Sequence, residues 1–99
     1  VNDYLIPKEF ILHQNYPNPF NPSTVISFSL SKEEFVSIDI YDINGTHMIS
    51  LFNGKKNIGT HHLNWNGRDK NGALITTVQY FYQMRTSSSS TVMKMLFIK

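Results

Sequence analysis

The chain contains no cysteine, which excludes disulfides, thiolate nucleophiles and thiolate metal sites. It has no marked excess of one charge either, because nine lysine and arginine residues stand against seven acidic ones. No basic cluster is longer than Lys55-Lys56, so a surface that follows nucleic-acid phosphates is not indicated. No apolar run approaches the roughly 18 residues of a membrane-spanning helix. The sequence therefore gives no sign of thiol chemistry, a nucleic-acid partner or a membrane-spanning segment.

Alternating apolar and polar residues dominate what is present, and no segment has a convincing helical period. A chain of 99 residues that is 40% hydrophobic and 13% aromatic fits one folded domain. A short extended piece is expected before Gln14. Strands are predicted at Thr24–Leu30, Phe35–Ile43, Thr46–Phe52, Thr60–Trp65, Val78–Arg85 and Thr91–Ile98. This succession predicts an all-β fold, an antiparallel sandwich of about seven strands.

Four Asn-Gly pairs separate the predicted strands, at 44–45, 53–54, 66–67 and 71–72. The first pair is typical of a type I′ hairpin turn, which needs positive φ at both residues. The second is expected to open the next turn, which residues 57–59 complete. Within the strands, alternate residues are expected to face the core. They are Ile26, Phe28, Leu30, Val36, Ile38, Ile40, Leu63, Trp65, Tyr80, Tyr82, Met84, Met93, Met95 and Phe97.

The densest run of turn residues precedes the first long strand. Three of the four prolines fall within residues 17–22, where missing N–H groups and restricted neighbours forbid a helix. Asparagine at every third position favours turns through side-chain hydrogen bonds to the backbone. Tyr16 and Phe20 are large apolar side chains on this irregular segment, and both rings are expected to close one open end of the sandwich. The structural motif comprises Asn15, Tyr16, Pro17, Asn18, Pro19, Phe20, Asn21 and Pro22.

Residues that could hold a metal are few and poorly spaced. His61 and His62 are adjacent on a predicted strand, so their side chains point to opposite faces and cannot share one ion. Asp69 and Asn71 lie in one polar loop and could offer oxygen ligands, although a calcium loop needs several carboxylates. The alternative is an Asx turn closed by Gly72. We therefore expect no cofactor, with Asp69 and Asn71 as the candidate metal ligands.

The sequence carries no catalytic pattern. Ser87–Ser90 lack a Gly-x-Ser-x-Gly context and have no paired histidine and acid. The seven acidic residues are scattered, and no pair is placed for general acid and base catalysis. The chain is therefore predicted not to be an enzyme.

Aromatic residues are the remaining candidates for binding. Trp65, Tyr80, Phe81 and Tyr82 could line a sugar-binding face, although aromatic residues on sandwich strands are more often packed between the sheets. Phe81 faces away from the two tyrosines beside it. It is therefore expected to cover a sheet edge or to meet a partner.

Several of these motifs together resemble the type A C-terminal sorting domain of the type IX secretion system, which ends exported proteins of Bacteroidota and related bacteria. The matching segments are 12–24, 40–45, 59–72, 80–84 and 94–99, and the resemblance covers about residues 7–99. The first segment is highly specific, whereas the others are shared with the Ig-like domain of flagellar hook-capping proteins. Two departures are the missing glycine before Tyr80 and Asn66 in place of the family's aspartate after Trp65.

The resemblance implies an Ig-like β-sandwich without an active site that serves as a secretion address. Residues 1–6 would be a linker or the end of an upstream region, and residues 7–99 the C-terminal sorting domain. The implied partners are the translocon, a sortase-like peptidase that cleaves at or before residues 1–6, and an upstream cargo domain in the same chain. The protein would cross the periplasm and end outside the cell or on its surface. Recognition by the translocon would fall on Lys94, Met95, Leu96, Phe97, Ile98 and Lys99.

A second interpretation stays open on the sequence alone. The chain could be a structural or carbohydrate-binding Ig-like module of a surface enzyme or an appendage. An exposed last strand favours the first interpretation, because its unpaired backbone groups can add to a partner's sheet. An exposed aromatic face favours the second.

Overall fold

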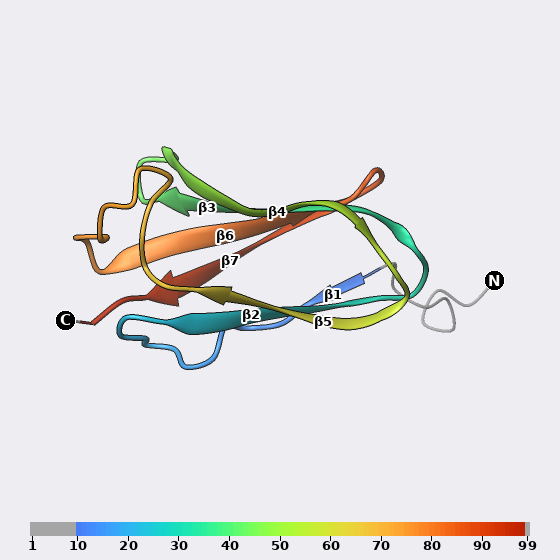
Figure 1. Ribbon diagram of the computed structural model, residues 1–99, viewed down its shortest axis with the longest axis horizontal. Helices are drawn as coiled ribbons and strands as arrows, with labels where there is room; N and C mark the ends of the chain where they lie inside the picture. The colour runs from blue at the N-terminus through green and yellow to red at the C-terminus, as the bar shows by residue number, and fades with distance from the viewer. Residues whose placement is uncertain (1–9, 99) are drawn as a thin grey trace.

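Two antiparallel sheets form the computed structural model, which describes residues 10–98 (Figure 1). One sheet has the strand order β1-β2-β5 and the other β4-β3-β6-β7. The strands are β1 (Phe10–Leu12), β2 (Thr24–Leu30), β3 (Glu34–Asp42), β4 (His47–Lys56), β5 (Gly59–Trp65), β6 (Gln79–Arg85) and β7 (Ser90–Leu96). The predicted all-β sandwich of seven strands is confirmed. The predicted linker at residues 1–6 and the domain start at residue 7 lie outside the described residues.

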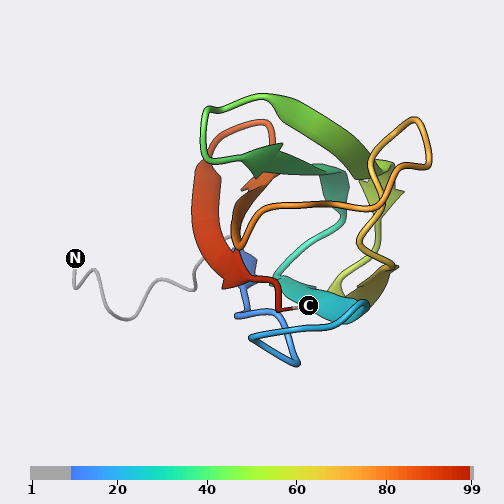
Figure 2. The same ribbon diagram turned by 90° about the vertical axis from the view of Figure 1, so that its left-hand side faces the viewer.

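The sheets face each other across one core, and their edges approach on two sides (Figure 2). On one side, β1 and the segment after it lie near β7, the last strand of the four-stranded sheet. On the other side, β4 passes through a short turn into β5 and so crosses from one sheet to the other. Among residues 10–98 there is no helix of the length and apolarity that a membrane crossing needs.

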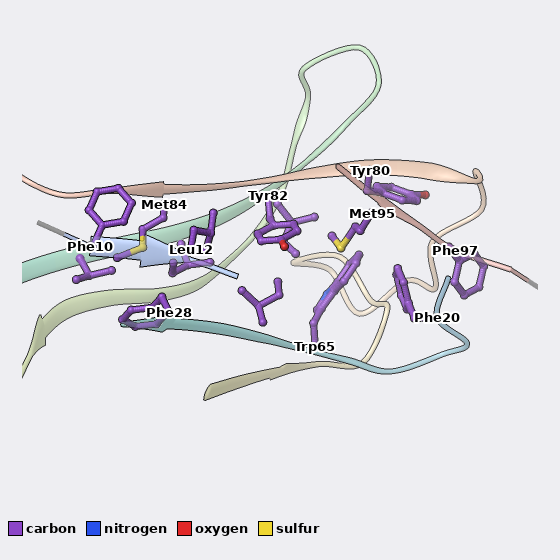
Figure 3. Packing of buried hydrophobic residues seen from close by; sticks show 14 of the residues in the cluster. Phe10, Leu12, Phe20, Phe28, Trp65, Tyr80, Tyr82, Met84, Met95 and Phe97 are labelled. Atoms are coloured by element: carbon purple, nitrogen blue, oxygen red, sulfur yellow. The ribbon is translucent and has the colours of Figure 1, made fainter. Parts of the chain in front are cut away.

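The period-two alternation of the strands builds the core. In β2, residues Ile26, Phe28 and Leu30 are buried while the residues between them are not. Figure 3 shows the aromatic rings and methionines of facing strands meeting between the sheets. Each large apolar side chain buried in this way contributes about 1.5–3 kcal/mol relative to exposure. The predicted inward residues are confirmed, although Leu63 and Met93 are only half-buried against the core.

The predicted turn at Asn53-Gly54 is wrong, because both residues lie inside β4. Gly54 pairs with Val36 of β3, and the strand continues to Lys56. The Phe52 ring lies over the glycine, so that a Cβ at position 54 would sit 3.2 Å from Cζ of Phe52. The turn preference of Asn-Gly is local, whereas the hydrogen-bonded pairing with β3 extends along the whole strand. This pairing outweighs the turn preference and keeps both residues in the strand.

The turn at Asn44-Gly45 is present, but its predicted type is wrong. Gly45 has φ +82°, and no other kind of residue in the described part of the chain has positive φ. The Gly45 N–H donates to the Asp42 carbonyl at 3.0 Å, and the Asp42 N–H donates to the Thr46 carbonyl at 3.0 Å. This pattern fits a three-residue loop in which a left-handed glycine follows a type I turn. The Asp42 Oδ1 accepts the N–H groups of Asn44 and Thr46, which stabilises the loop.

Candidate functional site

Strand β7, the predicted recognition strand, is the edge of the four-stranded sheet and pairs with β6. Two of the predicted recognition residues, Met95 and Phe97, are buried with exposures of 0% and 3%. Lys94 and Ile98 are exposed, and Leu96 is half-buried. Lys99 lies outside the described residues. A partner that reads the surface of this strand would therefore meet only alternate side chains.

The segment of residues 14–22, here called the cover segment, runs along the edge of β7 near its end. Side-chain amides and backbone groups of the cover segment take up four backbone groups of residues 94–98 that face away from β6. The contacts are Gln14 Nε2 to Lys94 O at 2.8 Å, Leu96 N to Asn18 Oδ1 at 2.9 Å, Phe20 N to Leu96 O at 2.9 Å, and Ile98 N to Phe20 O at 3.0 Å. The end of the recognition strand is thus hydrogen-bonded on both sides.

Phe20 anchors the cover segment in the core, as predicted. Its side chain is 1% exposed, and its ring centroid lies 5.5 Å from that of Trp65 and 5.4 Å from that of Phe97 (Figure 3). The same prediction for Tyr16 is wrong, because its side chain is 75% exposed. The backbone of Tyr16 pairs with Val25 in both directions, at 3.0 and 2.9 Å, and this pairing holds the residue at the rim with its ring in solvent.

A buried polar network holds the cover segment to β2 and β6. The Asn15 N–H donates to the Tyr82 hydroxyl at 2.8 Å, and that hydroxyl donates to the His13 carbonyl at 2.6 Å. The Asn15 Nδ2 donates to Thr24 Oγ1 at 3.0 Å and to the Pro17 carbonyl at 3.1 Å. Burial raises the pKa of Tyr82 to about 12, and the hydrogen bond from Asn15 offsets part of that rise. Tyr82 therefore stays a neutral donor at ordinary pH.

The polar loop that was the candidate cation site is an Asx turn in this structure. The Asp69 Oδ1 accepts the N–H groups of Asn71 at 2.9 Å and Ala73 at 3.0 Å. Gly72, at φ +84°, donates its N–H to the Asp69 carbonyl. Over residues 10–98, no group of three or more histidine and acidic side chains could hold a metal. Cation binding by Asp69 and Asn71 stays a prediction, and a single carboxylate would have to supply its charge.

This loop comes very close to the cover segment at Gly67. A Cβ at Gly67, where φ is +75°, would lie 2.8 Å from the Pro22 carbonyl oxygen. Such a distance is too short for any side chain, so the close approach of the two backbones requires glycine.

Each of the four histidines contacts a different group, and His61 and His62 point to opposite faces of β5 as predicted. His61 contacts the Asn57 carbonyl, and His62 and His13 contact serine hydroxyls on different residues. His47 Nε2 lies 2.8 Å from an oxygen of Asp39. These are separate contacts that support strand pairing, and none of them assembles a metal or catalytic group.

The aromatic residues divide between core and surface. Trp65, Tyr80 and Tyr82 are buried at 0–1% exposure and cannot contact a sugar. Phe81 is half-buried on the outer face of the four-stranded sheet, directly opposite Tyr41 of the neighbouring strand. The alternation predicted this outward position. Because β6 is an inner strand, Phe81 does not cover a sheet edge, and its contact with a partner stays a prediction.

Phe81 lies in a groove of about 440 Å³ that sequence reasoning did not find. The groove crosses the outer face of the sheet from the β3–β4 hairpin to β7. Its lining residues are Tyr41, Asp42, Ile43, Gly45, Phe81, Gln83, Arg85 and Val92. The Arg85 guanidinium donates to the Tyr41 hydroxyl at 3.0 Å, which fixes both side chains along the groove.

Comparison with known proteins gives one family. Residues 14–99 match the model of a secretion system C-terminal sorting domain. No curated protein sequence matches the chain.

Solved structures share the fold at low sequence identity. The chain is similar to part of dimeric latent PorU from Porphyromonas gingivalis, with a TM-score of 0.74 and 21% identity over 90% of this chain and 9% of that one. FlgD from P. aeruginosa gives a TM-score of 0.60 and 19% identity over 90% of this chain and 64% of that one. PorZ, a surface component of the type IX secretion system of P. gingivalis, gives a TM-score of 0.58 and 20% identity over 89% of this chain and 11% of that one. The chain thus spans less than two thirds of each.

Proposed function

The chain belongs to the family of secretion system C-terminal sorting domains, and we propose on this basis that it directs a cargo protein across the outer membrane through the type IX secretion system. Family membership implies a secreted protein with its cargo in the same chain. The observation that carries the proposal is the family match over nearly the whole domain. A fold that presents its last long strand as a sheet edge supports it.

We propose that the domain acts through protein–protein recognition and has no catalytic role of its own. The outward side chains in and just after the end of β7, Lys94, Leu96 and Ile98, are the surface offered to the translocon. Met95 and Phe97 act from the core by fixing the strand. Lys99 completes the proposed recognition residues.

Two steps of the proposed route concern other parts of the protein. The cargo crosses the periplasm with the folded domain attached and ends outside the cell or on its surface. A sortase-like peptidase cleaves upstream of the fold, at or before residues 1–6. A mass measurement on the secreted cargo tests this step, because retention of the whole domain would contradict cleavage.

The main test fuses the chain to a periplasmic reporter in a host that has the type IX system. We expect the fusion to reach the medium or the cell surface, and a folded fusion that stays in the periplasm contradicts the proposal. The double variant Lys94→Ala/Ile98→Ala should lower secretion about tenfold, as truncation of interface anchors does. The matched control Lys32→Ala/Ile11→Ala changes the same residue types at exposed positions outside β7 and should be secreted normally.

A further inference from the structure

The backbone N–H and carbonyl groups of successive residues in and after β7 point alternately toward β6 and toward the open edge. Leu96 directs both its N–H and its carbonyl to the cover segment, and the Lys94 carbonyl does the same. The Phe97 N–H instead bonds to Val78, on the side of β6, at 2.7 Å. In an antiparallel sheet, alternate residues of a strand direct their polar groups to opposite sides. Even-numbered residues of β7 therefore face the open edge, and Val92 is one of them.

The cover segment stops short of the first half of β7. Among residues 10–98, no group bonds to the N–H and carbonyl of Val92 or to the N–H of Lys94 on the edge side. These three groups form a straight, unpaired stretch, because β6 and β7 pair without a register shift. From Ser90 to Lys94, this part of the edge is five residues long, or about 17 Å of extended strand.

Of the three other sheet edges, β1 and β4 are less suited to strand addition, whereas β5 is seven residues long and pairs with β2 without a register shift. β1 has only three residues. β4 has two register shifts against β3, and the Lys70 N–H already bonds to the Met48 carbonyl at 2.8 Å. Short, bulged or covered edges are the usual protections of natural sheets. The part of β7 before Leu96 is neither short, bulged nor covered, its one charged side chain is the exposed Lys94, and a groove adjoins it at Val92.

The surface beside the open edge has a definite chemical character. Val92 is 53% exposed and lines one end of the groove that holds Phe81. Lys94 pairs with Phe81 across the strands, and no acidic side chain forms an ion pair with it among residues 10–98. Arg85 lines the same groove. The groove also holds Asp42, whose Oδ1 already accepts the N–H groups of Asn44 and Thr46, so Arg85 and Lys94 are the charged groups left to meet a partner. This surface complements a segment that has an apolar side chain next to an acidic one.

We propose that an extended segment of a protein partner, apolar with an acidic residue, pairs as an added strand with β7 at Val92 and Lys94. Backbone hydrogen bonds supply affinity in this mode, and side chains that enter adjoining pockets supply specificity. The apolar side chain enters the groove beside Phe81, and the acidic one meets Lys94. The inference rests on the proposed function, since the partner is then a component of the secretion system.

The decisive variant is Val92→Pro, which removes the edge-facing N–H without removing a bond to β6. Proline is tolerated on an edge strand where its N–H would face solvent. We expect secretion of the reporter fusion to fall about tenfold, because the partner carbonyl loses its donor. The matched control Val92→Ala keeps the N–H and should lower secretion by less than about threefold. Thermal unfolding of each purified fusion shows whether the domain remains folded.

A photo-reactive residue provides a second measurement that does not depend on proline. Placed at Val92 in secreting cells, it should cross-link to a type IX component that mass spectrometry identifies. Placed at Val25, an exposed valine of the other sheet, it should not. Absence of a cross-link at Val92 in a secreted fusion, or an equal yield at Val25, overturns strand addition at this edge.

The two proposals fail in different ways. A folded wild-type fusion that stays in the periplasm contradicts the secretion function. A wild-type fusion that is secreted, beside a folded Val92→Pro fusion that is secreted equally well, contradicts only the strand addition. Lys94→Glu should reduce secretion and Lys94→Arg should not, and equal secretion of these two variants contradicts the acidic character of the partner.

Discussion

The cover segment and the polar loop of residues 66–72 have similar compositions but different structural roles. Both are rich in asparagine and turn residues, and both lie between strands. The loop bonds largely to itself, through Asp69 and Gly72. The cover segment bonds to three strands and places Phe20 in the core. Composition therefore predicts that a segment is irregular, whereas its large apolar residue indicates whether it supports distant parts of the fold.

The largest expected effect is that of Phe20→Ala. Removing a ring that is 1% exposed should lower the free energy of unfolding by about 3–5 kcal/mol. Tyr16→Ala, in the same segment but 75% exposed, should change it by less than about 0.5 kcal/mol. Denaturant titration measures both. Equal effects of the two variants would contradict the conclusion that Phe20 anchors the segment in the core while the Tyr16 ring does not.

Gly67→Ala tests the close approach of the two regions at this position. Position 67 has a positive φ, and the new Cβ would lie 2.8 Å from the Pro22 carbonyl oxygen. We therefore expect the free energy of unfolding to fall by about 2–3 kcal/mol. Gly72→Ala is the matched control, since it has a similar φ of +84° and open space around it, and it should cost about 1 kcal/mol. If the two losses measured in denaturant are the same, the close approach of the backbones has no energetic role.

The Tyr82 network should make the cover segment sensitive to alkaline pH. Its pKa is raised to about 12 in the folded protein from 10.0, so the neutral phenol is favoured by folding. This contribution is complete below pH 10 and is lost as pH rises toward 12. Denaturant titrations across this range should show a decline in wild type that Tyr82→Phe reduces. An identical decline in both proteins would place its origin elsewhere.

The smallest effect is expected in the polar loop. Asp69→Ala removes the acceptor of two backbone N–H groups near the surface and should cost about 1 kcal/mol. Asn71→Ala, whose exposed side chain accepts no such bonds, should stay within about 0.5 kcal/mol of wild type. Calcium should leave the melting temperature of wild type unchanged. An increase with calcium that Asp69→Ala abolishes would show that the loop is a cation site.

Much of the fold could be predicted because its signals are local. The β2 strand has the predicted bounds, Thr24–Leu30, and its inward residues are those of the alternation. β3 begins and ends one residue before the predicted Phe35–Ile43. It ends at Asp42 because the carboxylate of this residue accepts the backbone N–H groups of the hairpin loop. Asn53-Gly54 misled the prediction, since the pairing of its strand with β3 is not visible in the two residues themselves.

The candidate site could be predicted only in part. The family motifs indicated the last strand, but not that half of its edge is covered. That cover depends on contacts between residues 78 and 80 positions apart, such as Asn18 with Leu96 and Gln14 with Lys94, for which the sequence carries no local signal. The groove at Phe81 likewise depends on three strands and a hairpin that only the tertiary fold brings together.

These long-range contacts have a consequence for how the domain folds. The cover segment can complete its hydrogen bonds only when β7, synthesised about 80 residues later, is in place. Contacts between residues so far apart in the sequence slow folding. A molecule that lost its last strand would leave Gln14 and Asn18 without these partners and Phe20 without the Phe97 ring. The cover segment therefore reaches its full set of hydrogen bonds only in a molecule whose last strand is in place.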